Sequence, residues 1–283
     1  MRTGRVAGSS SIRPTRSPCW LRTSTCIAAM VVVDRPRRPA TPDPGFETGL
    51  DLPIRSRGVI VASMQDWSSI LAGRFIVFDG PDGSGKSTQL ARFTAFCRSH
   101  GTAPEVVREP GGTPIGEAVR GVLLDPRYEE MDLRCEMLLY MASRSQLMAE
   151  RIRPTLEAGG FVLADRFISS TLAYQGTAGG LAPEEILAVG RVTTGGCEPD
   201  LVVIFDVDEK TAAARLPAEL DRMELKGEAF HRRVRQGYLA QADRDPDRHL
   251  VVDGTLDEES VFAALLEGLG RRLGVAGASS GPA

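Results

Sequence analysis

The most informative segment of the chain is Arg74-Phe-Ile-Val-Phe-Asp-Gly-Pro-Asp-Gly-Ser-Gly-Lys-Ser-Thr88. An apolar run leads into Gly80-x-x-x-x-Gly85-Lys86-Ser87, and helix-forming residues follow it. This context of strand, loop and helix is the one that a Walker A phosphate-binding loop requires, and a simple glycine-rich turn does not account for the Lys-Ser pair. The glycines let backbone N–H groups converge on a phosphate, while the lysine reaches the β and γ oxygens and the hydroxyl ligates Mg²⁺. We therefore expect an ATP site with Ser87 on the metal, formed by Gly80, Pro81, Asp82, Gly83, Ser84, Gly85, Lys86, Ser87 and Thr88.

Outward from this loop, short apolar runs alternate with stretches of helical periodicity. That alternation is typical of βαβ units and a parallel sheet. We predict an α/β P-loop kinase fold of three layers, with helices on both faces of a five-stranded parallel sheet and a short lid. The predicted strands are Arg74–Phe78, Glu105–Val107, Phe161–Ala164, Leu201–Phe205 and His249–Val252.

Capping signals place the helices between these strands. Thr113 followed by Pro114 predicts an N-cap and first turn, and the longest helix is expected over residues 132–158. Thr255 and Glu258 are read as a capping box for the last helix. Apolar residues at helical spacing are expected to give the first of these helices one shared face (Ile115, Val119, Val122, Leu123) and the last one its core face (Phe262, Leu265, Leu266, Leu269).

Composition divides the chain into unequal parts. The 283 residues are 42% hydrophobic, which is ample for a buried core, and the net charge of -3 gives no argument for binding nucleic acid or a membrane. Residues 1–63 contain ten arginines and four acidic residues and are rich in serine, threonine and proline, so we expect them to be disordered. Translation that starts downstream, at Met64 or Met30, a tail without function, and a targeting segment all remain open for this stretch. Residues 72–273 are expected to form the P-loop domain, and residues 274–283 a flexible tail.

The cysteines and the apolar runs indicate the cellular compartment of the protein. Five cysteines are scattered with no C-x-x-C pair, so we expect free thiols. The longest apolar run near the start, Cys26–Val33, falls short of the ~20 residues that a membrane span needs. We expect a cytoplasmic protein.

A second part of a phosphate site follows the third predicted strand. That strand ends in Asp165, and a carboxylate at the carboxyl edge of the sheet is where a P-loop enzyme orders the Mg²⁺ shell through water. An aspartate that ends a strand is usually a turn residue, so this signal depends on the loop that precedes it.

The class of P-loop protein is narrowed by what surrounds the loop. A GTPase needs Asn-Lys-x-Asp after a later strand, and none of the three lysines (Lys86, Lys210 and Lys226) has that setting. A motor or AAA-type ATPase needs further domains, for which the ordered part leaves no room. A small phosphoryl-transfer enzyme remains, and its acceptor must be recognised by residues between the strands.

Four short segments offer such recognition. They are Arg108-Glu-Pro-Gly-Gly-Thr113, the pair Tyr140 and Arg144 at i and i+4, Asp165-Arg-Phe167, and Ser169-Ser-Thr-Leu-Ala-Tyr-Gln-Gly176. The set suits a flat base that carries a phosphate. Taken singly, each residue also has a structural interpretation: Tyr140 in the core, Arg144 in a surface pair, Arg166 in an ion pair with Asp165, and Tyr174 in a turn.

From about Phe75 to Leu273 the chain resembles bacterial thymidylate kinases. The resemblance rests on Gly-x-Asp-Gly-x-Gly-Lys-Ser-Thr, Arg-Glu-Pro-Gly-Gly-Thr, Asp-Arg-Phe, Ala-Tyr-Gln-Gly, and Asp-Arg-Met-Glu with Phe-His-x-Arg-Val-Arg-x-Gly-Tyr, in that order. It implies transfer of the γ-phosphate of ATP to dTMP with Mg²⁺. It also implies a homodimer, in which Cys135–Tyr140 of the long helix face a partner.

The resemblance also implies individual roles for the residues that match. Tyr140 is expected to stack on thymine, Arg144 to bind its carbonyl edge, and Tyr174 to lie against the deoxyribose. The residues implied for dTMP are Asp82, Arg108, Tyr140, Arg144, Arg166, Ser170, Thr171, Tyr174 and Gln175, with Arg166 on the phosphate and Arg108 as a second phosphate contact.

The arginine that neutralises the migrating phosphoryl group is the point where the chain departs from the family. In some members it stands in the loop at the position of Gly83, so this chain is expected to supply it from a lid over about residues 214–226. The lid looks short and has only Arg215 and Arg222, of which Arg215 is preferred because Arg222 belongs to a hinge-like motif. The expected catalytic set is thus Lys86, Asp82, Arg215 and Arg166.

Three other interpretations stay open. The acceptor could be another deoxynucleotide or a deoxynucleoside, although Arg166 with Arg108 favours one that already carries a phosphate. A lid with so few arginines would also suit a nucleotide-binding module that no longer transfers a phosphoryl group. A GTP-dependent switch is the third.

Overall fold

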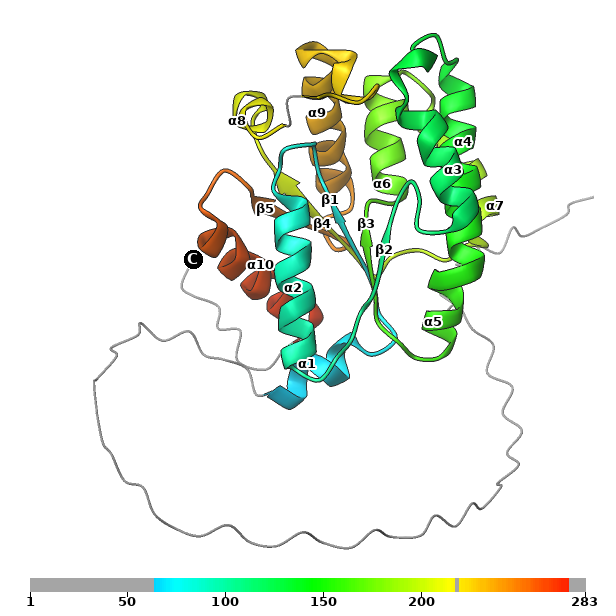
Figure 1. Ribbon diagram of the computed structural model, residues 1–283. Helices are drawn as coiled ribbons and strands as arrows, with labels where there is room; N and C mark the ends of the chain where they lie inside the picture. The colour runs from blue at the N-terminus through cyan, green and yellow to red at the C-terminus, as the bar shows by residue number, and fades with distance from the viewer. Residues whose placement is uncertain (1–63, 217–218, 275–283) are drawn as a thin grey trace, which may run out of the picture. The chain divides into compact units, whose positions relative to one another are not determined.

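The fold was analysed in a computed structural model, which describes residues 64–216 and 219–274. The predictions for residues 1–63, for lid positions 217–218 and for the tail beyond Gly274 lie outside the described residues. Five parallel strands form one sheet in the order β2-β3-β1-β4-β5 (Figure 1). They are β1 (Phe75–Asp79), β2 (Glu105–Arg108), β3 (Val162–Asp165), β4 (Leu201–Asp206) and β5 (His249–Asp253), which confirms the five predicted strands.

Helices connect and cover the strands. They are α1 (Met64–Leu71), α2 (Lys86–Ser99), α3 (Pro114–Leu124), α4 (Leu133–Leu147), α5 (Arg153–Glu157), α6 (Ile168–Thr171), α7 (Pro183–Thr194), α8 (Glu209–Ala214), α9 (Glu228–Arg244) and α10 (Glu258–Leu273). Two π-helical segments, η2 (Met148–Ile152) and η3 (Leu172–Ala178), and two 3₁₀ turns, η1 (Pro126–Tyr128) and η4 (Glu224–Lys226), complete the series. The predicted long helix is confirmed as α4, η2 and α5, which follow one another without a break.

One face of the sheet is covered by α1, α2 and α10. Successive residues of a strand point to opposite faces, and on this face Ile76 and Phe78 of β1 are buried. They share a cluster with Trp67 of α1, Phe93 of α2 and Leu265 of α10. The Trp67 and Phe93 rings meet edge to face at 6.4 Å between centroids.

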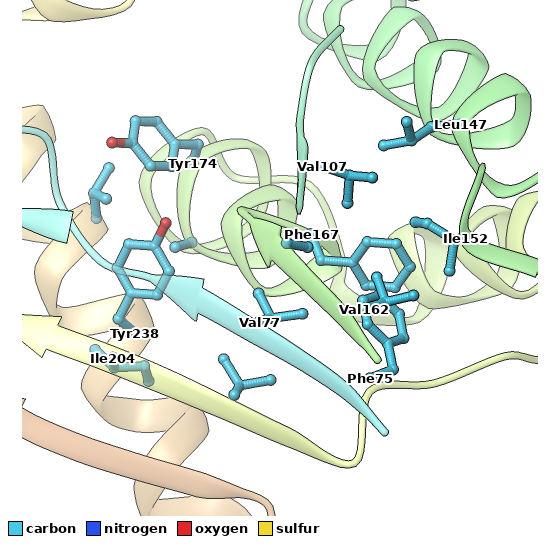
Figure 2. Packing of buried hydrophobic residues seen from close by; sticks show 14 of the residues in the cluster. Phe75, Val77, Val107, Leu147, Ile152, Val162, Phe167, Tyr174, Ile204 and Tyr238 are labelled. Atoms are coloured by element: carbon cyan, nitrogen blue, oxygen red, sulfur yellow. The ribbon is translucent and has the colours of Figure 1, made fainter. Parts of the chain in front are cut away.

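The opposite face is covered by α4 with η2, by α6 with η3, and by α9. Here Phe75 and Val77 of β1 pack with Ile152, Phe167 and Tyr238, as Figure 2 shows. Because β1 is buried on both faces and lies between β3 and β4, its carboxyl end is held firmly at the centre of the sheet. That end is the topological switch point, where α/β proteins bind their ligands.

The helix-start predictions had different outcomes. Thr113 is the N-cap of α3, with its hydroxyl accepting from Gly116 N at 3.0 Å, as expected. Ile115 and Val122 on the shared apolar face of α3 are 54% and 39% exposed, however, while Leu123 is buried. The apolar face of α3 is thus largely on the outside of this chain.

The predicted capping box at Thr255 is wrong. The N-cap of α10 is Asp257, whose carboxylate accepts from Ser260 N at 3.0 Å and Ser260 Oγ at 2.6 Å. Thr255 donates both its N–H and its hydroxyl to Asp253 Oδ1. Because the threonine is part of the turn after β5, it does not cap α10, and the helix begins later. The predicted core face is confirmed by Leu265 and Leu269, which are fully buried.

No helix in the described part of the chain is long and apolar enough to cross a bilayer. None of the three described cysteines, Cys97, Cys135 and Cys197, is in a disulfide.

Replacing Asp257 with alanine removes the observed cap of α10. We expect Asp257→Ala to lower the free energy of unfolding by about 1 kcal/mol. The matched variant Thr255→Ala is expected to change it by less than about 0.5 kcal/mol, because this threonine caps no helix. Urea unfolding of both variants checks the assignment, and a larger loss for Thr255→Ala would contradict it.

Candidate active site

The loop between β1 and α2 has the backbone of a phosphate cradle. Gly80, Gly83 and Gly85 have φ angles of 139°, 76° and 84°, a region that side chains disfavour. Gly85 is also the N-cap of α2 and provides no side-chain cap. The first N–H groups of α2 are therefore left for an anion at the positive end of the helix.

Two of these glycines are also required by close contacts with other elements. A Cβ on Gly80 would lie 2.5 Å from the carbonyl oxygen of Phe205 in β4. A Cβ on Gly83 would lie 2.3 Å from the carbonyl oxygen of Ala212, because the backbone of α8 packs directly on the loop (Figure 1). The loop is thus held between β4 and α8, and the space beside position 83 is filled by main chain.

The lysine of the loop and Asp165, the last residue of β3, lie close enough to interact. Lys86 is 7% exposed, and its Nζ donates to Pro81 O at 3.4 Å. Burial and the neighbouring Arg166 lower the pKa of Lys86, while Asp165, Asp82 and Asp79 oppose that shift. Ser87, in the first turn of α2, is exposed.

Asp165 fits the metal role that the sequence suggested. Its Oδ1 atom is buried and has no hydrogen-bond partner among the described residues, so a carboxylate oxygen is left without a donor beside Lys86. A hard cation prefers such an oxygen together with a hydroxyl. Asp165 and Ser87 are therefore the residues that would hold Mg²⁺.

Asp79, the last residue of β1, is the centre of a buried hydrogen-bond network that the sequence did not reveal. Its carboxylate is fully buried and accepts from Gly80 N at 2.9 Å, from Ser169 Oγ at 2.5 Å, from Ser170 Oγ at 2.7 Å and from Tyr238 OH at 2.6 Å. Strand β1, helix α6 and helix α9 are thereby fixed to one another beside the phosphate loop.

Arg166 lies between the phosphate loop and a second cavity. Its backbone has φ 70°, the one positive φ of a described residue other than glycine. The guanidinium donates to Gly80 O at 3.1 Å, to Tyr238 OH at 3.0 Å and to the carboxylate of Asp82. Burial would raise the pKa of Asp82, but Arg166, Lys86 and the hydrogen bond from Tyr174 outweigh it and lower the pKa to about 2. Asp82 therefore remains charged at working pH.

The second cavity, which we call the acceptor pocket, collects most of the residues that the sequence singled out. Eight of the nine residues expected for the acceptor line it: Asp82, Tyr140, Arg144, Arg166, Ser170, Thr171, Tyr174 and Gln175. Tyr174 OH donates to Asp82 Oδ2 at 2.7 Å. Asp82 thus belongs both to the phosphate loop and to the wall of this pocket.

Arg108 is the one expected residue that does not line the acceptor pocket. Its side chain is 49% exposed and pairs with Glu117 at 2.9 Å. Arg120 of α3 lines the pocket instead and donates to Pro110 O at 3.1 Å. Arg120 was not among the residues expected for the acceptor, although its place in the second turn of α3, after the Thr113 cap, could have indicated it.

Arg144 is neither exposed nor part of a surface pair. It is 1% exposed and pairs with Glu109 at 2.6 Å, while its Nη2 donates to Thr171 Oγ1 at 3.2 Å. Burial raises the pKa of Glu109 to about 7 against the opposing pull of Arg144. Glu109 also lines the pocket, and its Oε1 is buried without a partner among the described residues.

The two candidate arginines of the lid have different surroundings. Arg222 is 4% exposed; its Nε donates to Leu123 O at 2.7 Å and its Nη1 lies 2.6 Å from Glu136. Arg215, at the end of α8, is exposed and donates to Gly254 O at 2.8 Å. Its Nη1 lies 4.0 Å from a Cβ built on Gly85, so Arg215 is the one beside the phosphate loop.

A Walker A loop that shares Asp82 with a separate pocket, and that meets this pocket at Arg166, defines a phosphotransferase of the P-loop kinase class. Comparison with known proteins narrows this class. A family model described as thymidylate kinase matches residues 78–265. The chain belongs to the thymidylate kinase family.

Individual relatives agree with this assignment. The thymidylate kinase of Deinococcus radiodurans is 46% identical over 202 residues, which cover 71% of this chain and 98% of that protein. The thymidylate kinase of a Geobacillus species (strain WCH70) is 42% identical over 197 residues, covering 68% and 94%. The crystal structure of the thymidylate kinase from Ehrlichia chaffeensis has 30% identity and a TM-score of 0.57, covering 69% of this chain and 97% of that one.

The contact between Gly83 and α8 can be tested by adding one methyl group. Gly83→Ala is expected to weaken ATP binding at least tenfold, because the Cβ would displace either the loop or α8. Gly159→Ala is the matched control: it has the same φ of 76° but nothing within 4 Å of the added Cβ. The control should lose about 1 kcal/mol of stability through backbone strain and keep its ATP affinity. Calorimetric titration with ATP distinguishes the two, and equal affinities would contradict the proposed contact.

Proposed function

We propose that this chain transfers the γ-phosphate of ATP to dTMP, giving ADP and dTDP. The observation that carries the proposal is the adjacency of the phosphate loop and the acceptor pocket, which share Asp82 and meet at Arg166. Two substrates bound on either side of this boundary would bring their reacting phosphates together.

The acceptor pocket has a suitable group for each part of dTMP. Tyr140 offers a ring for stacking on the base, and Arg144 and Gln175 offer polar atoms for its edge. Tyr174, fixed by Asp82, would lie against the deoxyribose. Arg166 and Arg120, two of the three arginines that line the pocket, would bind the phosphate of dTMP.

The reaction needs no covalent enzyme intermediate, because the phosphate oxygen of dTMP can attack the γ-phosphorus of ATP directly. The protein then acts by positioning and by stabilising charge. The N–H groups of the loop and Lys86 would hold the β and γ phosphates, and Arg166 would orient the attacking phosphate. Mg²⁺, held by Ser87 and through water by Asp165, would neutralise charge on the transferred group.

We assign the further positive charge to Arg215. Arg222 is buried and bound to Glu136 and to a backbone carbonyl. Arg215 lies beside the loop, and among the described residues its guanidinium has Gly254 O as its one hydrogen-bond partner. Catalysis by Arg215 would require its guanidinium to leave that carbonyl for the γ-phosphate.

Removing Arg215 tests this assignment. Arg215→Ala is expected to lower kcat about 100-fold while KM for dTMP stays within a few-fold, as for a group that acts in the transition state. Arg127→Ala, at a side chain that is 81% exposed and does not line the acceptor pocket, is the control and should keep its kcat. An unchanged kcat for Arg215→Ala would contradict the role.

The substrate is tested by measuring ADP release with dTMP, dUMP, dCMP and thymidine, using the full chain and a chain that begins at Met64. We expect dTMP to give the highest kcat/KM. Preference for thymidine would contradict an acceptor that already carries a phosphate, and binding of ATP and dTMP without ADP release would indicate a nucleotide-binding module. Activity with GTP as sole donor would point to a different class.

We also propose a cytoplasmic homodimer that binds neither nucleic acid nor membranes. On α3, Ile115 and Val122 are exposed, and on α4, which packs against α3, Leu138 is 52% exposed and Cys135 is exposed as well. An apolar surface of this kind suits burial against a second copy.

A charge placed on this surface should separate the two copies. Leu138→Glu is expected to sediment as a monomer at concentrations where the unmodified chain is a dimer. Leu256→Glu, at a residue 45% exposed in the turn before α10, should leave the assembly unchanged. A monomeric unmodified chain, or a dimeric Leu138→Glu, would contradict this interface.

A further inference from the structure

Glu136 is a buried acid in the first turn of α4, and the proposed transfer assigns it no role. It is 1% exposed, yet three donors from distant parts of the chain converge on its carboxylate. Gln175 Nε2 lies 2.8 Å from Oε1, while Arg222 Nη1 at 2.6 Å and Lys226 Nζ at 3.1 Å lie on Oε2. Glu136 itself does not line the acceptor pocket, whereas its partner Gln175 does.

The carboxylate determines which way the amide of Gln175 points. Burial would raise the pKa of Glu136, but the hydrogen bond from Gln175 and the charges of Lys226 and Arg222 outweigh it, and the pKa is lowered. Glu136 is therefore ionised at neutral pH, and an ionised carboxylate only accepts hydrogen bonds. Only the NH₂ group of Gln175 can face it.

The opposite end of the amide is consequently an acceptor. Gln175 is 1% exposed and fully enclosed apart from the pocket that it lines. Within the described part of the chain no donor lies at hydrogen-bond distance from Gln175 Oε1, and this atom is not among the buried atoms left without a partner. The oxygen is thus available to a donor in the acceptor pocket.

A pyrimidine base can supply that donor in only one of its common forms. Thymine and uracil carry a hydrogen on N3, whereas N3 of cytosine is an acceptor and would face Oε1 with its lone pair. A site whose buried polar group is fixed as an acceptor rejects a ligand that cannot donate to it. This selectivity against cytosine is lost if the amide of Gln175 can rotate and present its NH₂ group to the base.

We infer that Glu136 is a positioning residue that makes the acceptor pocket select a base with an N3 hydrogen over cytosine, by holding Gln175 with its oxygen toward the base. This inference rests on the proposed function, since it takes the base of a nucleoside monophosphate to lie at Gln175. Glu136 also binds Arg222 at the end of the lid, so a test must separate selectivity from structural support.

The test is a double-mutant cycle read as the ratio of kcat/KM for dTMP to kcat/KM for dCMP. Glu136→Gln introduces a side chain that can donate or accept, so either orientation of Gln175 becomes possible. We expect its dTMP-to-dCMP ratio to fall at least about tenfold. In the background of Gln175→Met, which has no amide to orient, adding Glu136→Gln should change the ratio by less than about twofold.

Two further variants act as controls. Lys226→Met removes another partner of the same carboxylate but leaves the contact with Gln175, so its ratio should stay within about twofold of the unmodified chain. Glu136→Asp keeps a group that only accepts, so it should retain the preference for dTMP better than Glu136→Gln does.

An unchanged ratio for Glu136→Gln, or an equal fall with and without Gln175, would overturn the inference. If Glu136→Gln does not fold, Gln175→Met alone decides, since an unchanged ratio in that variant shows that the amide does not read the base. Failure of the unmodified chain to phosphorylate dTMP would instead overturn the proposed function, so the two failures are distinguishable.

Discussion

The carboxylate of Asp79 is the interaction on which the site depends. It ends the central strand and receives hydrogen bonds from the first N–H of the phosphate loop, from Ser169 and Ser170 of α6, and from Tyr238 of α9. Two of the hydroxyl groups that accept from Arg166, those of Ser170 and Tyr238, also bind this carboxylate. The phosphate loop and Arg166 are therefore positioned by one buried group, and removing any donor would leave part of that carboxylate unpaired.

The strands and the loop followed from the sequence because they are local properties. Apolar runs of strand length and a phosphate motif with its flanking elements can be read without knowing what packs on them. The hydrogen bonds that complete the site join residues far apart in the sequence, such as Glu136 and Gln175. The periodicity of one helix does not show which face of another helix it will contact. The wrong cap at Thr255 has a related cause, since both Thr255 and Asp257 are good caps and only the turn after β5 decides between them.

Arg108 and Arg120 show which features of the site a sequence motif predicts and which depend on the geometry of the strand or helix. Arg108 stands at the end of β2 with its side chain outward, paired with Glu117 of α3. The same helix carries Arg120 into the pocket wall. A motif places its residues near a site, but the direction of each side chain depends on strand alternation and helix phase. For that reason eight expected residues converge and the ninth faces away.

Geometry also explains why position 83 of the phosphate loop is glycine and not arginine. At position 83 the carbonyl of Ala212 fills the space that any Cβ would need, so the approach of α8 and a side chain in the loop exclude each other. That approach also carries Arg215, the residue that follows α8, to the flank of the loop, where it meets Gly254. Gly83, which gives the loop no arginine at this position, is thus also the residue that allows α8 to bring Arg215 beside the loop.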